Sequence, residues 1–300
     1  MLIILEQLFI LYAFLLIGWG FGKRKPDLVS HTQILSFLLV NLFLPAKVFN
    51  SFSKNFTKEY IGENYISIFI STALLLLLVG VSIVISKLLT KEPYERKVYR
   101  YSIVLANYAY LGYVLVENLY GDKALTTFIL FAIPFAIYTY SFGYMLLTES
   151  GKSFKKLFNP ITCAILIGAV VGLVELPIPD VVGKVITSSS SCVGPLAMLL
   201  TGISLSQFNI RELVAHKTTY LVCTIRLIVM PLLIFGLFKL LRLDSLLPYA
   251  VLMASMPTGL NTIVFPKLVG QDCKTGARLA FLTHIFSCLT VPFWLSLLKF

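Results

Sequence analysis

The sequence has few charged residues and lacks the short motifs of common enzyme classes. Only 13% of its 300 residues are charged, whereas a soluble domain carries roughly 25%. The chain contains no His-Glu-x-x-His segment, no Gly-x-Ser-x-Gly segment and no nucleotide-binding loop. These absences argue against a zinc protease, a serine hydrolase and an ATP-driven pump. We therefore expect no enzyme, no metal site and no cofactor.

Cysteine is also sparse, and its spacing predicts no cross-linked or metal-bound framework. None of the five cysteines belongs to a Cys-x-x-Cys pair, which argues against a structural zinc site and a set of disulfides. Most of them fall in apolar stretches, where cysteine acts as a small packing residue. They are Cys163, Cys192, Cys223, Cys273 and Cys288.

Long apolar stretches dominate what the sequence does contain. Hydrophobic residues make up 58% of the chain, and segments such as Ile66–Ile85 contain no charged residue. About 20 apolar residues in a helix cross the ~30 Å hydrocarbon layer of a membrane. The sequence therefore predicts an all-α polytopic membrane protein with ten transmembrane helices. The predicted spans are 2–22, 32–52, 64–88, 97–120, 123–147, 158–176, 184–207, 213–240, 246–270 and 275–298.

The basic residues indicate how these spans are oriented. The net charge is +11, and most Lys and Arg residues lie in the loops between spans 1–2, 3–4, 5–6, 7–8 and 9–10. Cytoplasmic loops of membrane proteins are rich in Lys and Arg. We therefore expect a multi-pass plasma (inner) membrane protein with both termini outside the cytoplasm, and no nucleic-acid partner.

The two halves of the chain are similar to each other. One offset of about half the chain separates three pairs of positions, which are Pro45 and Pro195, Tyr101 and Tyr249, and Gly121 and Gly270. Residues 1–150 and 151–300 then each contain five spans. Because five is odd, the second repeat is inverted relative to the first. Inverted repeats are common in secondary transporters, which bind substrate where the repeats meet.

Spans 4 and 9 occupy equivalent places in the repeats, and both contain residues that interrupt helices. Residues 107–112 read Asn-Tyr-Ala-Tyr-Leu-Gly, and residues 256–261 read Met-Pro-Thr-Gly-Leu-Asn. Gly and Pro weaken a helix there, and lipid offers no partner to the freed backbone groups. If the breaks cross, two half-helix N-termini with the amides of Asn107 and Asn261 would form an anion site. Ordinary helix kinks are the alternative.

At these segments the sequence resembles the auxin efflux carrier family, which includes bacterial malate permeases and plant PIN-type auxin exporters. The resemblance extends over essentially the whole chain. It rests on the segments NLFLPAKVFNSF, NYAYLGYVLVENLYG, NPITCAILIGAVVGL, GPLAMLLTGISLS and MPTGLNTIVF, which begin at residues 41, 107, 159, 194 and 256.

The resemblance implies a carrier of a small organic anion, such as malate or an auxin-like acid, that works by alternating access. Spans 1, 2, 6 and 7 would form a scaffold bundle and the interface of a homodimer. Spans 3–5 and 8–10 would form a transport bundle in which broken helices 4 and 9 cross. The substrate carboxylate would contact Asn107, Tyr108, Gly112, Pro257, Thr258 and Asn261. The helix-break or structural positions would be Pro45, Pro195, Gly202 and Gly259.

Two positions depart from the family pattern. Val114 stands where the family often has a proline, so Gly112 must unwind span 4 alone, or the span unwinds less. Lys47 stands where an apolar residue is usual. It would either extend to the outer interface or bind a carboxylate, that of the substrate or of Glu117. Glu117 would either carry a coupled proton or cap the end of span 4.

Three other ionisable residues lie inside predicted spans, namely Arg226, Lys267 and His284. We expect Arg226 to be a structural anchor and Lys267 to lie at the cytoplasmic end of span 9. His284 would either pack in the helix or titrate near neutral pH. No pair of Asp residues lies mid-span, so a coupling proton or sodium ion has no acidic pair to bind, although backbone carbonyls could bind sodium. An anion channel or a non-transporting sensor or scaffold is the alternative function.

Overall fold

Every regular element in the part of the chain that the structure describes is a helix. The computed structural model describes residues 2–149 and 159–298. The predicted start of span 6 at residue 158 and the boundary between the two repeats at 150–151 lie outside the described residues. Seven helical stretches are long and apolar enough to cross a membrane. They are Leu2–Arg24, Leu28–Asn55, Lys58–Leu89, Tyr108–Thr148, Asp180–Ser206, Lys217–Leu240 and Lys274–Leu297.

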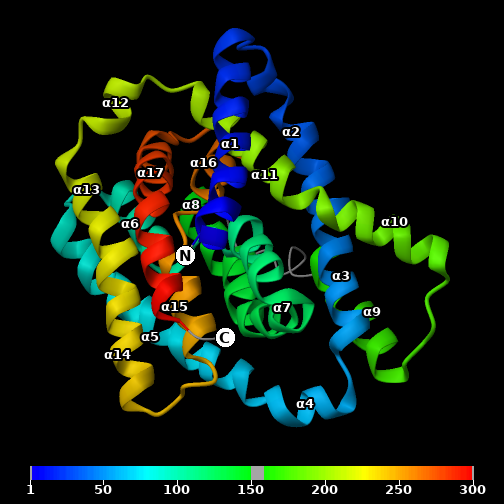
Figure 1. Ribbon diagram of the computed structural model, residues 1–300. Coiled ribbons are helices and arrows are strands. Elements are labelled where there is room, and N and C mark those ends of the chain that lie inside the picture. The colour runs from blue at the N-terminus through cyan, green and yellow to red at the C-terminus, as the bar shows by residue number, and fades with distance from the viewer. Residues whose placement is uncertain (1, 150–158, 299–300) are drawn as a thin grey trace.

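The individual helices follow the chain in the order shown in Figure 1. The first half contains α1 (Leu2–Arg24), α2 (Leu28–Leu38), η1 (Leu39–Phe43), α3 (Leu44–Asn55), α4 (Lys58–Asn64), α5 (Ile66–Leu89), α6 (Pro93–Val104), η2 (Tyr108–Gly112), α7 (Tyr113–Tyr138), η3 (Thr139–Gly143) and α8 (Tyr144–Thr148). The second half contains α9 (Pro160–Val174), α10 (Asp180–Ser191), α11 (Val193–Ser206), α12 (Ile210–Val214), α13 (Lys217–Thr224), η5 (Ile225–Val229), α14 (Met230–Leu240), α15 (Leu247–Ser255), α16 (Asn261–Leu268) and α17 (Lys274–Leu297).

Each of the ten predicted intervals contains helix, although only seven helical stretches within residues 2–149 and 159–298 are long and apolar enough to span. Span 6 corresponds to α9, which is apolar but has only 15 residues. Span 4 is interrupted between α6 and η2, and span 9 between α15 and α16. The two interrupted spans are those that the Gly, Pro and Asn residues mark in the sequence.

Two glycines turn the chain at equivalent places in the two halves. Gly121, inside α7, has φ 81° and ψ 178°, so the chain changes direction there and spans 4 and 5 are separate. Gly270, after α16, has φ 70°. Side chains other than glycine rarely adopt these angles. The glycine pair that marks the repeat in the sequence therefore has a positive φ in both halves.

Helix irregularities precede three of the prolines. Pro45 follows η1 and Pro231 follows η5, and both segments are π-helical turns. Because proline has no N–H, the carbonyl four residues earlier needs another donor. For Pro231 that carbonyl belongs to Leu227, and the indole Nε1 of Trp294 donates to it at 2.8 Å. Pro195 lies in the first turn of α11, directly after the turn that separates α11 from α10.

Glycines allow two helix pairs to pack closely. α1 packs along α11, where a Cβ atom at Gly202 would lie 2.0 Å from the carbonyl oxygen of Leu15. α9 packs along α3, where a Cβ atom at Gly172 would lie 2.6 Å from the carbonyl oxygen of Phe52. Gly202 is therefore a structural position. Its alternative role as a helix break is wrong, because it lies within the helix α11.

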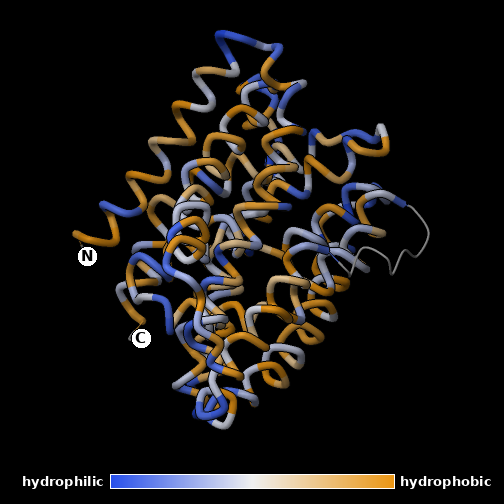
Figure 2. Tube along the Cα trace, turned by 90° about the vertical axis from the view of Figure 1, so that its right-hand side faces the viewer, coloured by the Kyte–Doolittle hydropathy of each residue, from blue (hydrophilic) through white to orange (hydrophobic). Residues whose placement is uncertain are grey.

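The surface of the molecule suits a lipid environment. Large hydrophobic side chains such as Leu88, Leu240 and Leu289 are highly exposed. Figure 2 shows hydrophobic stretches along most helices, with hydrophilic residues at the turn between α1 and α2. In the view of Figure 1, α3, α9 and α10 lie on the right, and α13, α14 and α17 lie on the left. In this view α7 and α16 lie between the two groups, whereas α6 lies on the left.

Candidate functional site

The two interrupted helices contact each other at their breaks. Ala106, between α6 and η2, forms an antiparallel bridge with Thr258, between α15 and α16. The backbone N–H of Asn107 donates to the carbonyl oxygen of Pro257 at 2.7 Å. Backbone groups that lose their helical partners at one break therefore find partners at the other break. Non-helical backbone at membrane depth needs such partners, because lipid offers none.

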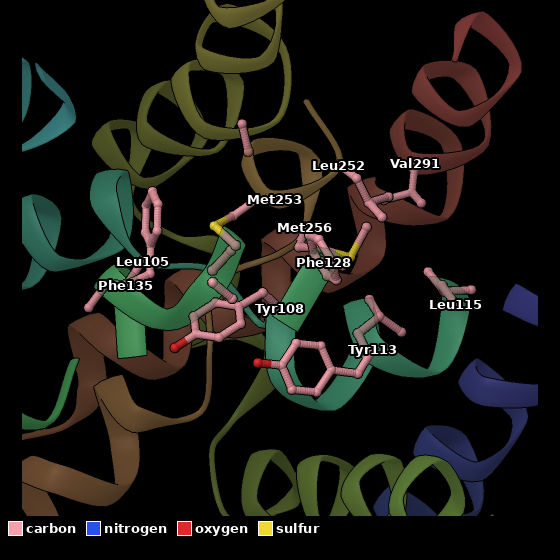
Figure 3. Packing of buried hydrophobic residues seen from close by; sticks show 14 of the residues in the cluster. Leu105, Tyr108, Tyr113, Leu115, Phe128, Phe135, Leu252, Met253, Met256 and Val291 are labelled. Atoms are coloured by element: carbon pink, nitrogen blue, oxygen red, sulfur yellow. The ribbon is translucent and has the colours of Figure 1, made fainter. Parts of the chain in front are cut away.

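The break in the first half lies before Gly112. Unwinding through Gly112 alone is therefore wrong, and the alternative that the span unwinds less agrees with the helix that continues past Gly112. Gly112 has helical angles, φ −63° and ψ −47°. The chain leaves the helix at Leu105, with φ −108° and ψ 131°, because the N–H of Asn107 bonds to the other break. Gly112 is needed for packing, since a Cβ atom there would lie 2.9 Å from the ring of Phe128. Figure 3 shows that ring beside Met256.

One buried arginine joins the helix ends at both breaks. Arg226, in η5, is only 1% exposed. Its guanidinium donates to the carbonyl oxygens of Ile103 at 2.8 Å, Met253 at 3.0 Å and Met256 at 3.3 Å. Ile103 and Met253 belong to the last turns of α6 and α15. Arg226 thus occupies the structural position that the sequence predicts, at a specific place between the broken helices.

Both helix-end carbonyls lack the donor that a continuous helix would provide, which is the N–H four residues later. For Ile103 this is the N–H of Asn107, which bonds to the other break. For Met253 it would come from Pro257, which has no N–H. Within residues 2–149 and 159–298, no carboxylate forms an ion pair with Arg226. The centre of the molecule therefore keeps an excess positive charge.

A small cavity of about 30 Å³ lies where the segments after the two breaks begin. Its lining includes Tyr101, Asn107, Tyr108, Gly259 and Asn261. Asn107 directly precedes η2, and Asn261 is the first residue of α16. The cavity has room for about one water molecule. Four of the positions predicted from the sequence therefore share one enclosed space at two helix N-termini.

The other predicted substrate positions lie outside this lining. Pro257 and Thr258 form the backbone contacts between the breaks. The N–H of Thr258 also donates to Oγ1 of Thr283 at 3.0 Å, whereas its own Oγ1 has no partner among the described residues. Gly112 packs against the ring of Phe128. These three positions shape the break more directly than they line the cavity.

The side chain of Asn107 is held by a histidine. Its Nδ2 lies 3.3 Å from Nε2 of His284, in α17, and both residues are buried. The other ring nitrogen of His284 lies 2.7 Å from the carbonyl oxygen of Ala280. His284 is buried and each ring nitrogen has a partner, which fits the packing interpretation, and one of those partners is a predicted substrate residue.

Two larger cavities lie at opposite ends of α11. The first, the Lys47 cavity, has a volume of about 440 Å³ and is lined by Lys47, Val114, Glu117 and the start of α11. The second, the Lys267 cavity, has a volume of about 680 Å³ and is lined by α2, Val264, Lys267 and the end of α11. Val114 and Val264 are 150 positions apart, as are Glu117 and Lys267. The two cavities therefore use equivalent positions of the two halves.

Lys47 and Glu117 form an ion pair in the wall of the Lys47 cavity. The Lys47 side chain is only 2% exposed, and that of Glu117 is 22% exposed. Extension of Lys47 to the outer interface is therefore wrong, and its pairing with Glu117 is the alternative that the structure shows. Glu117 lies one turn before the kink at Gly121 that ends span 4, and the partner of its carboxylate is Lys47.

Glu117→Ala is expected to destabilise the protein more than Lys47→Met. Loss of Glu117 leaves a buried ammonium without a partner, which costs about 3–5 kcal/mol. Loss of Lys47 leaves a carboxylate that still reaches the cavity, so the cost is smaller. Thermal unfolding in detergent compares both with Asp244→Ala, which breaks the exposed pair with Lys239 and should cost under about 1 kcal/mol. Equal losses in the first two variants would contradict this difference.

Comparisons with known proteins agree with the helical architecture. A family model described as membrane transport protein matches residues 3–157 and residues 152–295. The chain is 26% identical over 308 residues to the uncharacterized transporter MJ1031 of Methanocaldococcus jannaschii, with 97% of each chain covered. It is 27% identical over 196 residues to an uncharacterized transporter of Methanothermobacter thermautotrophicus, covering 63% of this chain and 64% of the relative.

Proposed function

The chain belongs to the membrane transport protein family, the auxin efflux carrier family, and on this premise we propose that it is a secondary transporter of a small organic anion. The family consists of membrane transporters and not of enzymes. The observation that supports an anionic substrate is the cavity at the N-terminal ends of η2 and α16, with Asn107 and Asn261 in its lining. Helix N-termini favour negative charge, and the unpaired guanidinium of Arg226 adds to this preference.

The proposal includes the finer architecture. Ten spans would form two inverted five-helix repeats, 1–150 and 151–300, in a plasma membrane with both termini outside the cytoplasm. Support comes from helix in all ten predicted intervals, from the positive φ angles of Gly121 and Gly270, and from the two stretches that the family model matches. The basic loops support the orientation.

Alternating access is the transport mechanism that the cavities support best. The small cavity between the breaks has room for about one water molecule, so binding of an organic anion requires a larger cavity to deepen toward it. The Lys47 and Lys267 cavities lie at opposite ends of α11 and use equivalent residues of the two repeats. One would open outward and the other inward, in turn.

The moving parts would be two bundles. α1, α2, α3, α9, α10 and α11 form the proposed scaffold, held together by the glycine contacts of α1 with α11 and of α9 with α3. The other helices, including both broken ones, form the transport bundle. A homodimer that meets through the scaffold is part of the same proposal.

The proposed site is tested by Asn107→Ala combined with Asn261→Ala. Each lost hydrogen bond to a carboxylate costs about 1.5–3 kcal/mol, so kcat/KM should fall at least tenfold. Counterflow of radiolabelled malate in liposomes measures this, and counterflow itself separates a carrier from an anion channel. Asn64→Ala is the matched control, because Asn64 lies in α4 and its side chain bonds the carbonyl oxygen of Tyr60 at 3.0 Å. Unchanged transport by the folded double variant would reject the site.

A further inference from the structure

The hydrogen bonds of His284 fix where its ring carries a proton. Nδ1 lies 2.7 Å from the carbonyl oxygen of Ala280. A carbonyl oxygen only accepts, so Nδ1 carries a hydrogen. In the neutral ring Nε2 then has none, and it accepts from the amide Nδ2 of Asn107 at 3.3 Å. His284 therefore determines which way the Asn107 amide is turned.

This contact controls what Asn107 presents to the small cavity. One N–H of the amide is used by His284, which leaves one N–H and the oxygen Oδ1. If the ring gains a proton, both ring nitrogens donate, and Nε2–H faces the NH₂ group of Asn107. The amide must then turn so that Oδ1 accepts from Nε2. Both amide N–H donors become free for an anion in the cavity.

We propose that His284 takes up one proton as the organic anion binds, so that the two are carried together. This inference rests on the proposed transport function and names its coupling ion. An imidazolium is costly in a buried position, and a carboxylate beside Asn107 offsets that cost while gaining an amide donor. The coupling is reciprocal, so the proton also strengthens anion binding. His284 acts through Asn107 as a positioning residue and returns the proton to water when the anion leaves.

The ionisable groups nearest along the chain and on facing helices have other partners. The ring of Tyr12, on α1, packs edge-on to His284 with centroids 6.5 Å apart, and its hydroxyl lies 2.5 Å from Oγ of Ser287. The thiol of Cys288, on α17, is directed at the carbonyl oxygen of His284 at 3.5 Å. On η5, Arg226 bonds the carbonyls of the breaks.

No carboxylate within the described ranges 2–149 and 159–298 forms an ion pair with His284. The carboxylate of Glu95, of α6, meets α17 at Thr275, and the backbone carbonyl oxygen of Glu212, of α12, accepts from Arg278. Both contacts lie more than one turn before His284. Ionisable groups on the remaining helices packed against α17 include Cys223 of α13, Tyr249 of α15 and Lys267 of α16. A bound carboxylate would therefore supply the counter-charge that the protein itself does not.

Nitrogen NMR of the purified protein in detergent, labelled with ¹⁵N-histidine, tests the tautomer. The chain has three histidines, so His284→Gln removes one of three sets of signals and assigns it. We expect the hydrogen on Nδ1 at neutral pH. A hydrogen on Nε2 instead would overturn the proposal, because Asn107 would then already be turned the other way.

Reversal potentials of radiolabelled malate in liposomes test the coupling. A potassium gradient with valinomycin sets the membrane potential, and the reversal potential gives the net charge moved with each malate. Malate is a dianion at neutral pH, so one co-transported proton leaves one net charge per malate in the wild type. His284→Gln cannot take up the proton and should move two charges, and it should no longer accumulate malate on a pH gradient.

Ser287→Ala is the matched control, because it lies on the same helix, removes the partner of Tyr12 and leaves the Asn107 contact in place. It should still move one charge per malate. The same charge per malate in the wild type and in His284→Gln would overturn the proton proposal alone. Absence of saturable movement of malate and of a panel of other mono- and dicarboxylates in the wild type would instead overturn the proposed function, and this inference with it.

Discussion

Replacing Arg226 by methionine is expected to lower the free energy of unfolding by about 3 kcal/mol or more, because each buried acceptor left without a donor costs about 1–3 kcal/mol. Methionine fills similar space but donates no hydrogen bond. The carbonyl oxygens of Ile103, Met253 and Met256 then lose their donor. Packed side chains and lipid offer no replacement. Both broken helices lose their shared anchor, so transport should fail as well.

Thermal unfolding of the purified variants in detergent measures this loss. Arg226→Lys keeps the charge, but a compact ammonium group cannot direct donors at all three carbonyl oxygens as the planar guanidinium group does. This variant should therefore be more stable than Arg226→Met and less stable than the wild type. Arg278→Met is the matched control, because Arg278 is partly exposed and bonds one carbonyl oxygen, that of Glu212. It should cost less than about 1 kcal/mol. An Arg226→Met protein as stable as the wild type would show that the helix-end carbonyls need no donor.

The sequence predicts where the helices break but not what causes the first break. Asn107 and Asn261 line the small cavity, as the motifs suggest. Unwinding through Gly112 alone is wrong, because the helix propensity of residues in span 4 does not indicate a hydrogen bond to a segment 150 positions away. With Val114 in place of a proline, the helix after Asn107 continues without interruption to Gly121. The first break therefore depends on the second, which contains its own proline, Pro257.

Residues that act through several backbone groups are hard to recognise in a sequence. Lys47 and Glu117 stand out, because two opposite charges in apolar spans favour pairing. Arg226 binds three carbonyl oxygens. Every residue has a carbonyl group, so the residue types do not indicate which ones Arg226 binds. His284 contacts Asn107 across 177 positions of the chain. Only the folded arrangement of the helices brings these partners together.

One signal present in the sequence predicts helix packing and is missing from our sequence analysis. Gly18 and Gly22 are four residues apart, and so are Gly168 and Gly172, which lie 150 positions later. Small residues at this spacing let membrane helices approach closely. Both pairs meet neighbouring helices in the structure, α11 and α3 respectively. A glycine spacing that recurs at the repeat offset therefore marks equivalent helix contacts.

Gly202→Ala and Gly20→Ala are expected to change stability in opposite directions, although both add one methyl group to a helix. At Gly202 the new Cβ atom would lie 2.0 Å from the carbonyl oxygen of Leu15 and 2.5 Å from the backbone nitrogen of Trp19. Backbone atoms cannot turn aside, so α1 must move away from α11. Overpacking of this kind costs about 1–3 kcal/mol or more.

At Gly20, on α1, a Cβ atom would meet no other atom within 4 Å. Alanine there gains helix propensity of up to about 1 kcal/mol and loses nothing in packing. Thermal unfolding in one detergent compares the two variants directly, so effects of the detergent cancel. A loss of stability in both variants would mean that these glycines are needed for flexibility of the helices and not for close packing. Opposite signs would establish that close backbone approach holds α1 on α11, which is the contact that a rigid scaffold needs.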